Sequence, residues 1–330
     1  MVYEEFKWKN VLIIGGLGFI GSNLAKRIVE RKSELGINKI VVVDSLESEC
    51  GGSLENVKGF ERDLEIHKIR MSNEKMKEII KGIDIVFNLA GQTGHSLSME
   101  NPLLDMGLNY EENLKFLEII RKENKKAIVI FASTRQVYGK QTKLPVKEEN
   151  ELNPPDINAV HKIAAEQLYL LYNRVYGIRS CVLRATNVFG ERQRIKDARL
   201  GVLGFFIGLA LQNKKIILYD GKQIRDVNYV EDVADAFILA AENISKTGGK
   251  IFNIGGEKTS LLEFVEKIGK FVNADYKIEE FPEYKKKIDI GDFYSDYSKF
   301  EKATGWKPET STEEGIKKTI EFYKENKQYL

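Results

Sequence analysis

Residues 11–24, VLIIGGLGFIGSNL, are the stretch that decides the fold. The first four residues are apolar and mostly β-branched, and the run is too short for a helix, so it predicts a buried strand. Gly15, Gly18 and Gly21 follow at three-residue spacing, and a helical pattern begins after them. The first glycine allows a sharp turn, the second lets backbone approach a pyrophosphate, and the third lets helix and strand pack closely. The stretch therefore predicts a dinucleotide-binding turn, with the pyrophosphate at the start of the helix.

A carboxylate ends the next predicted strand. The strand 39–43 leads directly into Asp44, which follows the last glycine of the turn by 23 residues. At that position an acid can hydrogen-bond the ribose hydroxyls of an adenosine. It would repel a 2′-phosphate, and the next two residues, Ser45 and Leu46, supply no cation. The sequence thus favours NAD over NADP.

The composition narrows the classes of protein that this chain can be. At 330 residues it is long enough for a large core and two lobes. Its 51 Lys and Arg against 49 Asp and Glu leave a net charge of +2, so we expect no nucleic-acid partner. The longest apolar run, 202–211, is too short to span a bilayer, and the acidic N-terminal segment is unlike a secretory signal. Two cysteines without metal-ligand spacing favour a reduced, cytoplasmic protein with no metal site.

The order of the predicted elements indicates the fold class. Strand and helix patterns alternate through the first half, which predicts right-handed crossovers and a parallel sheet. We expect an α/β fold, a Rossmann-type doubly wound parallel sheet with a smaller C-terminal substrate-binding lobe. The NAD-binding domain is placed at 1–185 plus about 225–255, and the second lobe at 186–224 plus 256–330. A cleft between the two would hold the second substrate.

Ligands of such sheets gather beyond the carboxyl ends of the strands. Gly91, Thr134 and Asn187 all follow or end predicted strands, so we expect them at the binding site. The polar segment 142–156 predicts a loop over this site, and 157–176 predicts one long helix with a wide apolar face.

Further motifs resemble, in the same order, those of the NAD-dependent sugar-nucleotide epimerase/dehydratase family, within the extended short-chain dehydrogenase/reductase superfamily. NLAG at 88–91 resembles the family's cofactor-lining turn, and STRQVYG at 133–139 resembles its catalytic serine/threonine strand end. LRATNVFGER at 183–192 and IRDVNYVEDVADA at 224–236 resemble its L-R-x-x-N-V-Y-G-P-R and R-D-F-x-Y-V-x-D-V-x-x-A motifs. The resemblance covers nearly the whole chain and includes the UDP-glucose 4-epimerases.

This resemblance implies roles for individual residues. Thr134 would hydrogen-bond the reacting sugar oxygen, and Lys162 would hold the nicotinamide ribose. Asn187 and Arg225 would bind the diphosphate of a nucleotide sugar, and Ser98, in an S-x-x-x-P motif, would contact the substrate. The implied contacts to NAD come from Gly15, Gly18, Phe19, Ile20, Gly21, Asp44, Leu89, Ala90, Gly91 and Lys162.

The chain departs from the family at its catalytic tyrosine. In the family a tyrosine four residues before the lysine takes a proton from a sugar hydroxyl, but here that residue is Asn158. An amide can orient a hydroxyl but cannot accept its proton at neutral pH. Spacing by four keeps Asn158 and Lys162 on one helix face, so we expect Asn158 to point at the reacting centre.

Three groups are candidates for the missing base. His95 lies in a loop on the ligand side of the predicted sheet, near the S-x-x-x-P motif. His161 adjoins Lys162, but neighbouring helical residues diverge by about 100°, which favours a partly buried structural histidine. Lys162 itself could act as a base if it is desolvated.

The reaction is narrowed by a second departure. Arg135 and Gln136 stand where the dehydratase branch has the acid pair of S-T-D-E-V-Y-G, and neither side chain can act as acid and base. We therefore expect an epimerase that oxidises a sugar hydroxyl, with C4 favoured, and returns the hydride to the opposite face of a keto-sugar. The alternatives are a nucleotide-sugar dehydratase or dehydrogenase/reductase with another base, and a non-catalytic nucleotide-sugar binder.

The resemblance also implies a homodimer. In the family two long helices of each subunit form a four-helix bundle, and here these would be about 108–123 and 157–176. The apolar face of the second helix fits such a bundle and fits an ordinary core equally well.

Overall fold

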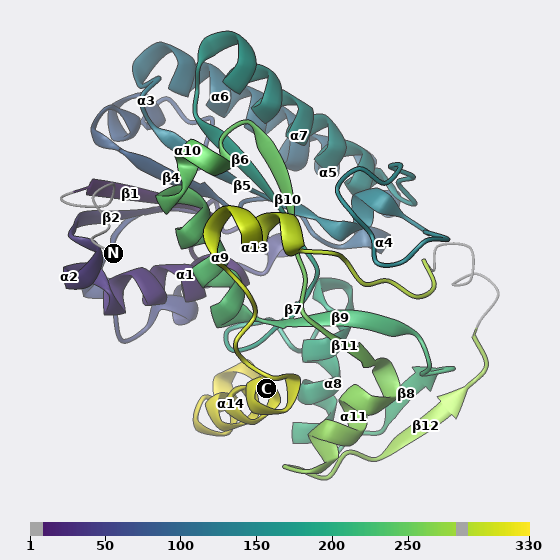
Figure 1. Cartoon of the computed structure of the whole chain (residues 1–330). Coiled ribbons are helices and arrows are strands. Elements are labelled where there is room, and N and C mark those ends of the chain that lie inside the picture. The colour runs from purple at the N-terminus through teal and green to yellow at the C-terminus, as the bar shows by residue number, and fades with distance from the viewer. Residues whose placement is uncertain (1–8, 282–289) are drawn as a thin grey trace.

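The computed structural model describes residues 9–281 and 290–330, and in these residues seven parallel strands form one sheet (Figure 1). In spatial order the strands are β10 (Lys250–Ile254), β6 (Ser180–Ala185), β5 (Ile128–Thr134), β4 (Ile85–Asn88), β1 (Lys9–Ile14), β2 (Ile37–Val43) and β3 (Glu65–His67). The strand order runs outward in both directions from β1, which creates a crevice between β1 and β4. The predicted α/β class and doubly wound sheet are confirmed.

The sheet is parallel because both of its faces are covered. Residues 11–14 of β1 pair with 40–43 of β2 on one side and 85–88 of β4 on the other, and all four are almost completely buried. A strand buried on both faces needs a continuous apolar run rather than an alternating one. This is the pattern from which the first strand was predicted.

Helices cover the two faces in two layers, seen above and below the sheet in Figure 1. Apolar residues of α1 and α9 share one core cluster with the sheet, and those of α3, α6 and α7 share the other. The helices of this lobe are α1 (Phe19–Glu30), α2 (Lys32–Leu35), α3 (Met76–Ile79), α4 (His95–Glu100), α5 (Pro102–Met106), α6 (Glu112–Glu123), α7 (Ile157–Tyr176), α9 (Val230–Glu242), α10 (Ile244–Thr247) and α13 (Ser298–Thr304).

A smaller lobe packs below this sheet in Figure 1 around a third apolar cluster. Its strands form one three-stranded sheet, in the order β11, β9, β7, and one parallel pair, β12 with β8. Its elements are β7 (Asn187–Phe189), α8 (Val202–Leu211), β8 (Ile216–Tyr219), β9 (Ile224–Tyr229), β11 (Glu257–Ser260), α11 (Leu261–Gly269), β12 (Tyr276–Glu279) and α14 (Thr312–Glu325). The chain returns to the large lobe with α9, after β9 has joined the small sheet.

The long helix α7 positions much of the site. Asp156 caps its N-terminus by accepting from the Ala159 N–H, and Gly177 ends it in a left-handed conformation at φ 73°. These two signals explain why the bounds 157–176 are those that the sequence predicts. The other predicted long helix, 108–123, begins instead with a π-helical turn, Gly107–Glu111, which precedes α6.

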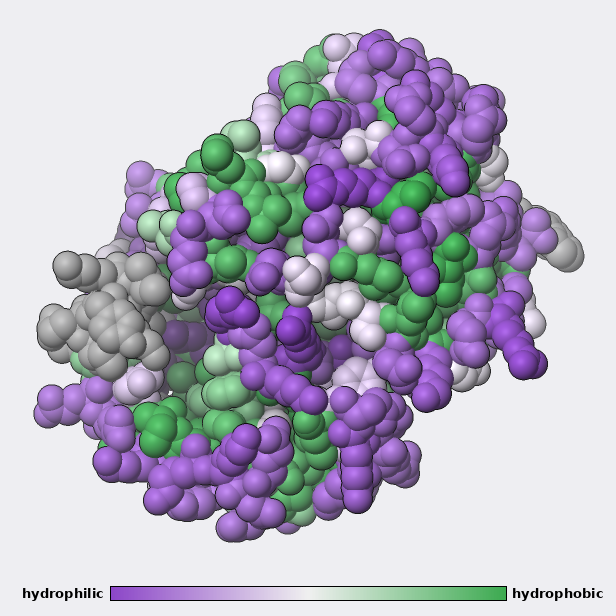
Figure 2. Space-filling view, turned by 180° about the vertical axis from the view of Figure 1, so that it is seen from behind, coloured by the Kyte–Doolittle hydropathy of each residue, from purple (hydrophilic) through white to green (hydrophobic). Residues whose placement is uncertain are grey.

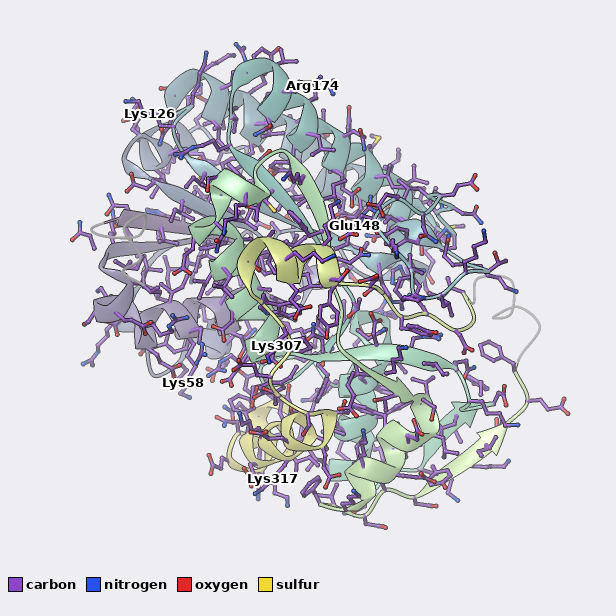
Figure 3. All side chains as sticks on the ribbon, viewed as in Figure 1. Lys58, Lys126, Glu148, Arg174, Lys307 and Lys317 are labelled. Carbon is purple, nitrogen blue, oxygen red and sulfur yellow. The ribbon has the colours of Figure 1, made fainter. Side chains whose placement is uncertain are left out.

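The loop 142–156 contains neither a helix nor a regular strand. Its residue Val146 forms an isolated bridge with Ser295, and Glu148, labelled in Figure 3, accepts from the Asn253 N–H at 2.9 Å. These contacts fix the loop against β10 and the segment before α13.

Charged side chains are spread over the surface. The labelled residues Lys58, Lys126, Arg174, Lys307 and Lys317 are exposed and project from separate parts of the chain (Figure 3). Within the ranges 9–281 and 290–330, every helix is too short or too polar to cross a membrane.

Candidate functional site

Two adjoining cavities open at the carboxyl ends of the strands. The first, here called the strand-end pocket, has a volume of about 70 Å³ and lies against β1, β2 and β4, with Asp44 on its wall. The second, the central cleft, has a volume of about 400 Å³ and is also lined by residues 186–188 and 198–203 of the second lobe. Gly15, Gly18 and Gly91 belong to both walls, so the two cavities form one elongated site. In Figure 2 the surface is hollowed between the two lobes.

The glycine turn leaves no room for side chains. Gly15 has φ +76°, and a Cβ there would lie 2.8 Å from the backbone nitrogen of Ala90. A Cβ at Gly21 would overlap the carbonyl oxygen of Gly15. The turn therefore holds β1, the β4 end and the N-terminus of α1 closely together, and bare backbone faces the pocket.

The Asp44 carboxylate is held by backbone amides. One oxygen accepts from the Leu46 N–H at 2.8 Å and the other from the Leu17 N–H at 3.0 Å. Burial raises the pKa of Asp44, and the two amides act in the opposite direction. The side chain is thus fixed at the end of β2, with its negative charge on the wall of the strand-end pocket.

Lys162 lies inside the protein on the face of α7 that meets β5. Its Nζ donates to the carbonyl oxygen of Ala132 at 3.1 Å and stands 4.9 Å from the ring centre of Phe131. Burial lowers its pKa to about 8, against the opposing influence of Asp105 and Glu166. Lys162 is therefore a cation with an unusually easily removed proton, on the wall of the central cleft.

Thr134 ends β5 beside this lysine and also lines the central cleft. Its hydroxyl oxygen accepts from the Gln136 N–H at 3.2 Å, which begins the short 3₁₀ turn after the strand. The hydroxyl hydrogen stays available to a ligand, so Thr134 can donate to an oxygen in the cleft.

Asn158 lines the central cleft, but its amide nitrogen is committed to a buried network. It donates to the carbonyl oxygen of Gln92 at 2.7 Å and to Oδ2 of Asp105 at 3.1 Å. Asn109 donates to the same two acceptors. Asn158 is 2% exposed and Asp105 is fully buried. The residue that replaces tyrosine thus anchors α7 to α5 and to the segment after β4.

The two histidines near the site have different surroundings. Nδ1 of His161 lies 2.6 Å from Oδ1 of Asp105, and His161 is not among the described residues that line the central cleft. His95 does line the cleft, and its Nδ1 lies 2.9 Å from Oδ2 of Asp156. Of these two candidate bases, only His95 is therefore placed where a substrate could reach it.

A buried ion pair between Glu166 and Arg184 lies next to the ends of β5 and β6. Glu166 accepts two bonds from the Arg184 guanidinium, at 2.8 and 2.6 Å, and a third from the Ser133 hydroxyl at 2.5 Å. Both charged residues are almost completely buried, so neither is free to act on a ligand. Their role is to hold α7 against β5 and β6 next to Thr134.

The second lobe contributes polar groups to the opposite wall. Asn187 accepts from the Arg135 guanidinium at 3.1 Å, and both residues line the central cleft. Two further arginines, Arg194 and Arg199, line it as well. No Asp or Glu occurs among the described residues of this lining, so the cleft is suited to anionic ligands.

Most of the residues predicted for the site come together. Each one predicted to bind NAD lines at least one cavity, and Thr134, Asn158, Lys162, His95 and Asn187 line the central cleft. Two predicted substrate contacts lie elsewhere. Ser98 is fully buried, with its hydroxyl between the His95 carbonyl and the Asn158 N–H, and Arg225 donates to the Gly291 carbonyl outside the lining.

The prediction missed Asp105, Asn109, Arg194 and Arg199. The arginines follow the LRATNVFGER motif closely, and that proximity was an available signal. Asn109 lies in the π-helical turn, a feature frequent at functional sites but without a sequence signature here. Within the described residues its Oδ1 is buried without a hydrogen-bond partner, and a Cβ at Gly91 would overlap it. This orphaned acceptor lies beside Gly91, which lines both cavities.

These features define a doubly wound α/β protein with a dinucleotide site beside a second, cationic cleft. Residues 11–255 match the model of the NAD dependent epimerase/dehydratase family. The chain belongs to this family, and its cofactor is NAD. The residues fit that group, because the glycine turn presents bare backbone to a pyrophosphate and Asp44 follows β2, where such folds bind the ribose. Lys162 lines the second cavity, and the orphaned Asn109 acceptor lies beside Gly91.

Relatives with the same fold act on several nucleotide sugars. The CDP-paratose 2-epimerase of Salmonella typhi is 30% identical over 344 residues, which cover 94% of this chain and 98% of the relative. The structure of a UDP-N-acetylglucosamine 4-epimerase from Methanobrevibacter ruminantium is similar, with a TM-score of 0.86, 29% identity, and coverage of 97% and 99%. The UDP-glucose 4-epimerase of Thermotoga maritima has a TM-score of 0.82, 30% identity, and coverage of 96% and 99%.

Proposed function

We propose that this protein is an NAD-dependent epimerase of nucleotide-diphosphate sugars that inverts C4. One observation carries the proposal: Thr134 and Lys162 line the same cleft, whose other walls hold arginines and no described acid. That arrangement matches a substrate with an anionic diphosphate and a sugar hydroxyl near the cofactor. Similarity to two 4-epimerases supports C4, although the 2-epimerase relative is 30% identical to this chain.

The residues of the chain bind and orient the reacting sugar. Thr134 donates a hydrogen bond to the oxygen at the reacting carbon, and Lys162 holds the nicotinamide ribose, its charge also stabilising negative charge on that oxygen. Bound NAD supplies a group that can accept a hydride from the sugar and give it back. Asn187, Arg194 and Arg199 bind the diphosphate. The same role for Arg225, and substrate contact for Ser98, stay predictions.

A dehydratase is a weaker candidate for this chain. Arg135 and Gln136 follow Thr134 at the strand end, where elimination of water would need an acid and a base. Gln136 is 7% exposed and donates to Asp156, while Arg135 donates to Asn187. Neither side chain can exchange a proton at neutral pH.

The test is product analysis by NMR with the purified protein, NAD and a panel of UDP-hexoses, their N-acetylated and uronate forms, and a CDP-hexose. We expect inversion at C4 of at least one UDP-sugar and loss of rate in Thr134→Val, which keeps the shape of the side chain and removes its hydroxyl. Loss of water would indicate a dehydratase. Binding without turnover of any sugar would indicate a non-catalytic binder.

The protein also has an apolar surface suited to a homodimer. Exposed apolar residues gather on the side of α4, α5 and α7, where Figure 2 shows a hydrophobic patch at the upper left. Leu103 of α5 is 73% exposed. On α7, Val160, Leu171 and Val175 share one face, because separations of 11 and 15 residues are near-integral numbers of turns. These residues are Met99, Leu103, Met106, Val160, Leu171, Val175 and Tyr176.

A dimer with α6 and α7 of each subunit in a four-helix bundle would bury this patch. Light scattering coupled to size exclusion should give twice the 37.7 kDa mass, and Leu103→Glu should shift it towards the monomer. The control Leu54→Glu changes an exposed leucine outside the patch. A monomeric wild type would contradict the dimer. The cytoplasmic location stays a prediction from the two free cysteines.

A further inference from the structure

His95 and Asp156 form a pair at the mouth of the central cleft. His95 begins α4 and Asp156 caps α7, so residues far apart in sequence meet where two helices start. Nδ1 of His95 lies 2.9 Å from Oδ2 of Asp156 and is buried, and no described residue makes a hydrogen bond of regular geometry with it. Asp156 therefore acts on Nδ1 through its charge and proximity. The His95 side chain as a whole is nevertheless 41% exposed. Its accessible edge is therefore the opposite one, which carries Nε2, and His95 lines the cleft.

Asp156 is fixed and stays ionised. Its Oδ1 accepts from the Ala159 N–H at 2.8 Å, and its Oδ2 accepts from the Gln136 amide at 3.1 Å. Burial acts to raise the pKa of Asp156, but His95 and these donors outweigh it and lower the pKa. An ionised carboxylate beside Nδ1 keeps the proton of a neutral imidazole on that nitrogen. Nε2 then has a free lone pair directed away from Asp156.

The other titratable groups of the cleft cannot readily take a proton. Within the part of the chain that the structure describes, these lining side chains are Cys50, His95, Arg135, Lys162, Arg194 and Arg199. Arginine stays protonated in proteins, and burial raises the pKa of Cys50 to about 12. Lys162 is mostly protonated at neutral pH, since its pKa is about 8. A neutral imidazole is the remaining group of the cleft that can accept a proton, because the Asn158 amide cannot do so.

We propose that His95, oriented by Asp156, is the proton acceptor that replaces the missing tyrosine. The inference rests on the proposed epimerase activity. In the first half-reaction the O–H bond at the reacting carbon breaks and its proton passes to Nε2. The C–H bond breaks with its electron pair, which leaves as hydride to the oxidised nicotinamide, and C–O becomes C=O. In the second half-reaction hydride returns to the other face of the carbon, and Nε2 gives its proton back to the oxygen.

Three variants test this assignment. In His95→Gln we expect kcat to fall by about 10²- to 10⁴-fold, the usual contribution of a positioned base, with NAD content and sugar affinity retained. Added imidazole should partly restore the rate in His95→Ala. Asp156→Asn keeps a helix-capping side chain but loses the charge, so it should lower kcat without unfolding α7. The matched control His161→Gln changes the histidine outside the cleft and should keep the wild-type rate.

The pH profile separates a catalytic role from a structural one. Wild-type kcat/KM should fall towards acidic pH as an imidazole takes a proton. This fall, the acidic limb of the pH profile, should vanish in His95→Gln. The elements packed against α4 carry several charged and titratable groups. They are Asp105 of α5, the α7 cap Asp156, His161, Lys162, Glu166, Tyr169, Tyr172, Arg174 and Tyr176 of α7, and Asp197 and Arg199 at the 3₁₀ turn before α8. The limb should persist in His161→Gln.

The outcomes distinguish this inference from the proposed function. An active wild type together with an active His95→Gln that keeps its acidic limb would overturn the assignment and leave the epimerase standing. A rise in KM alone in His95→Gln would mean that His95 only binds the sugar, which also overturns it. A wild type without turnover of any sugar in the panel would remove the proposed function and the inference with it.

Discussion

The amide nitrogen of Asn158 donates to Oδ2 of the fully buried Asp105 across 3.1 Å. Asp105 also accepts from Asn109 and lies 2.6 Å from His161. One carboxylate of α5 thus collects polar groups from the π-helical turn and from α7. Because buried carboxylates need such partners, the residue in the tyrosine position has acquired a role in stability.

Asn158→Ala should therefore destabilise the fold. It removes one hydrogen bond from Asp105 and one from Gln92, leaving Asn109 as the remaining amide donor to both, and two such bonds contribute about 1–3 kcal/mol of unfolding free energy. Urea unfolding monitored by circular dichroism measures the difference. The control Asn38→Ala alters an exposed asparagine and should stay within about 0.5 kcal/mol of wild type. Equal stability of Asn158→Ala and wild type would contradict the structural role.

The lowered pKa of Lys162 makes stability depend on pH. The pKa is about 8 in the folded protein and 10.5 in the reference state. Between these values the unfolded chain binds a proton that the folded protein has lost, so the unfolding free energy rises with pH. Relative to Lys162→Met, the NAD-free wild type should gain up to about 3 kcal/mol from pH 8 to pH 10.5.

Urea unfolding of both proteins at pH 7, 9 and 10 gives this difference directly. The other ionisable groups are common to both proteins and cancel. Lys126→Met, which changes an exposed lysine, should show a constant difference from wild type over the same range. A constant difference for Lys162→Met as well would mean that its ammonium group is not desolvated.

Gly21→Ala should reduce NAD binding. Its Cβ would overlap the Gly15 carbonyl oxygen, so the turn and the start of α1 must move apart. We expect the affinity for NAD to fall at least about tenfold, since the backbone amides lose their alignment with the pyrophosphate. Calorimetric titration measures the change. The control Gly269→Ala, whose nearest contact would be 4.0 Å away, should bind NAD normally.

Asp44→Asn should weaken the preference for NAD over NADP. The substitution removes the negative charge that repels a 2′-phosphate and weakens the bonds to ribose hydroxyls. Hydrogen bonds to a charged group contribute about 1.5–3 kcal/mol, so NAD affinity should fall by about 10- to 100-fold. Titration with both cofactors gives the ratio, and Asp63→Asn serves as the exposed control. An unchanged ratio of NAD to NADP affinity would mean that the adenosine ribose does not bind beside Asp44.

Local patterns predicted the parts of the fold and site that depend on neighbouring residues. The glycine turn and Asp44 lie within one strand–helix–strand unit, so spacing alone assigned them. The bounds of α7 follow from Asp156 and Gly177, each next to the helix that it ends. Lys162 was assigned from the resemblance to the family, whose lysine follows the catalytic position by four residues.

Contacts between segments distant in sequence could not be predicted from these local patterns. The expectation that Asn158 faces the reacting centre accounted for the helix face but not for Gln92 and Asp105, which arrive from other segments and occupy its amide. The pairing of His95 with Asp156 likewise depends on how α4 and α7 converge. Both are consequences of packing, which periodicity and spacing do not encode.

The last strand of the large sheet has a consequence for synthesis of the chain. β10 pairs along β6, yet about 65 residues separate the two in sequence, and part of the small lobe lies between them. While the ribosome is still making that part, β6 is an open edge with unpaired amides and carbonyls, and such edges template aggregation. A chain stopped before residue 250 should therefore accumulate as insoluble material. A chain that reaches 254 can pair β10 with β6, which moves the edge to β10, where the Asn253 N–H donates to Glu148. The large lobe therefore cannot finish folding before much of the small lobe has been synthesised, although the two lobes have separate cores.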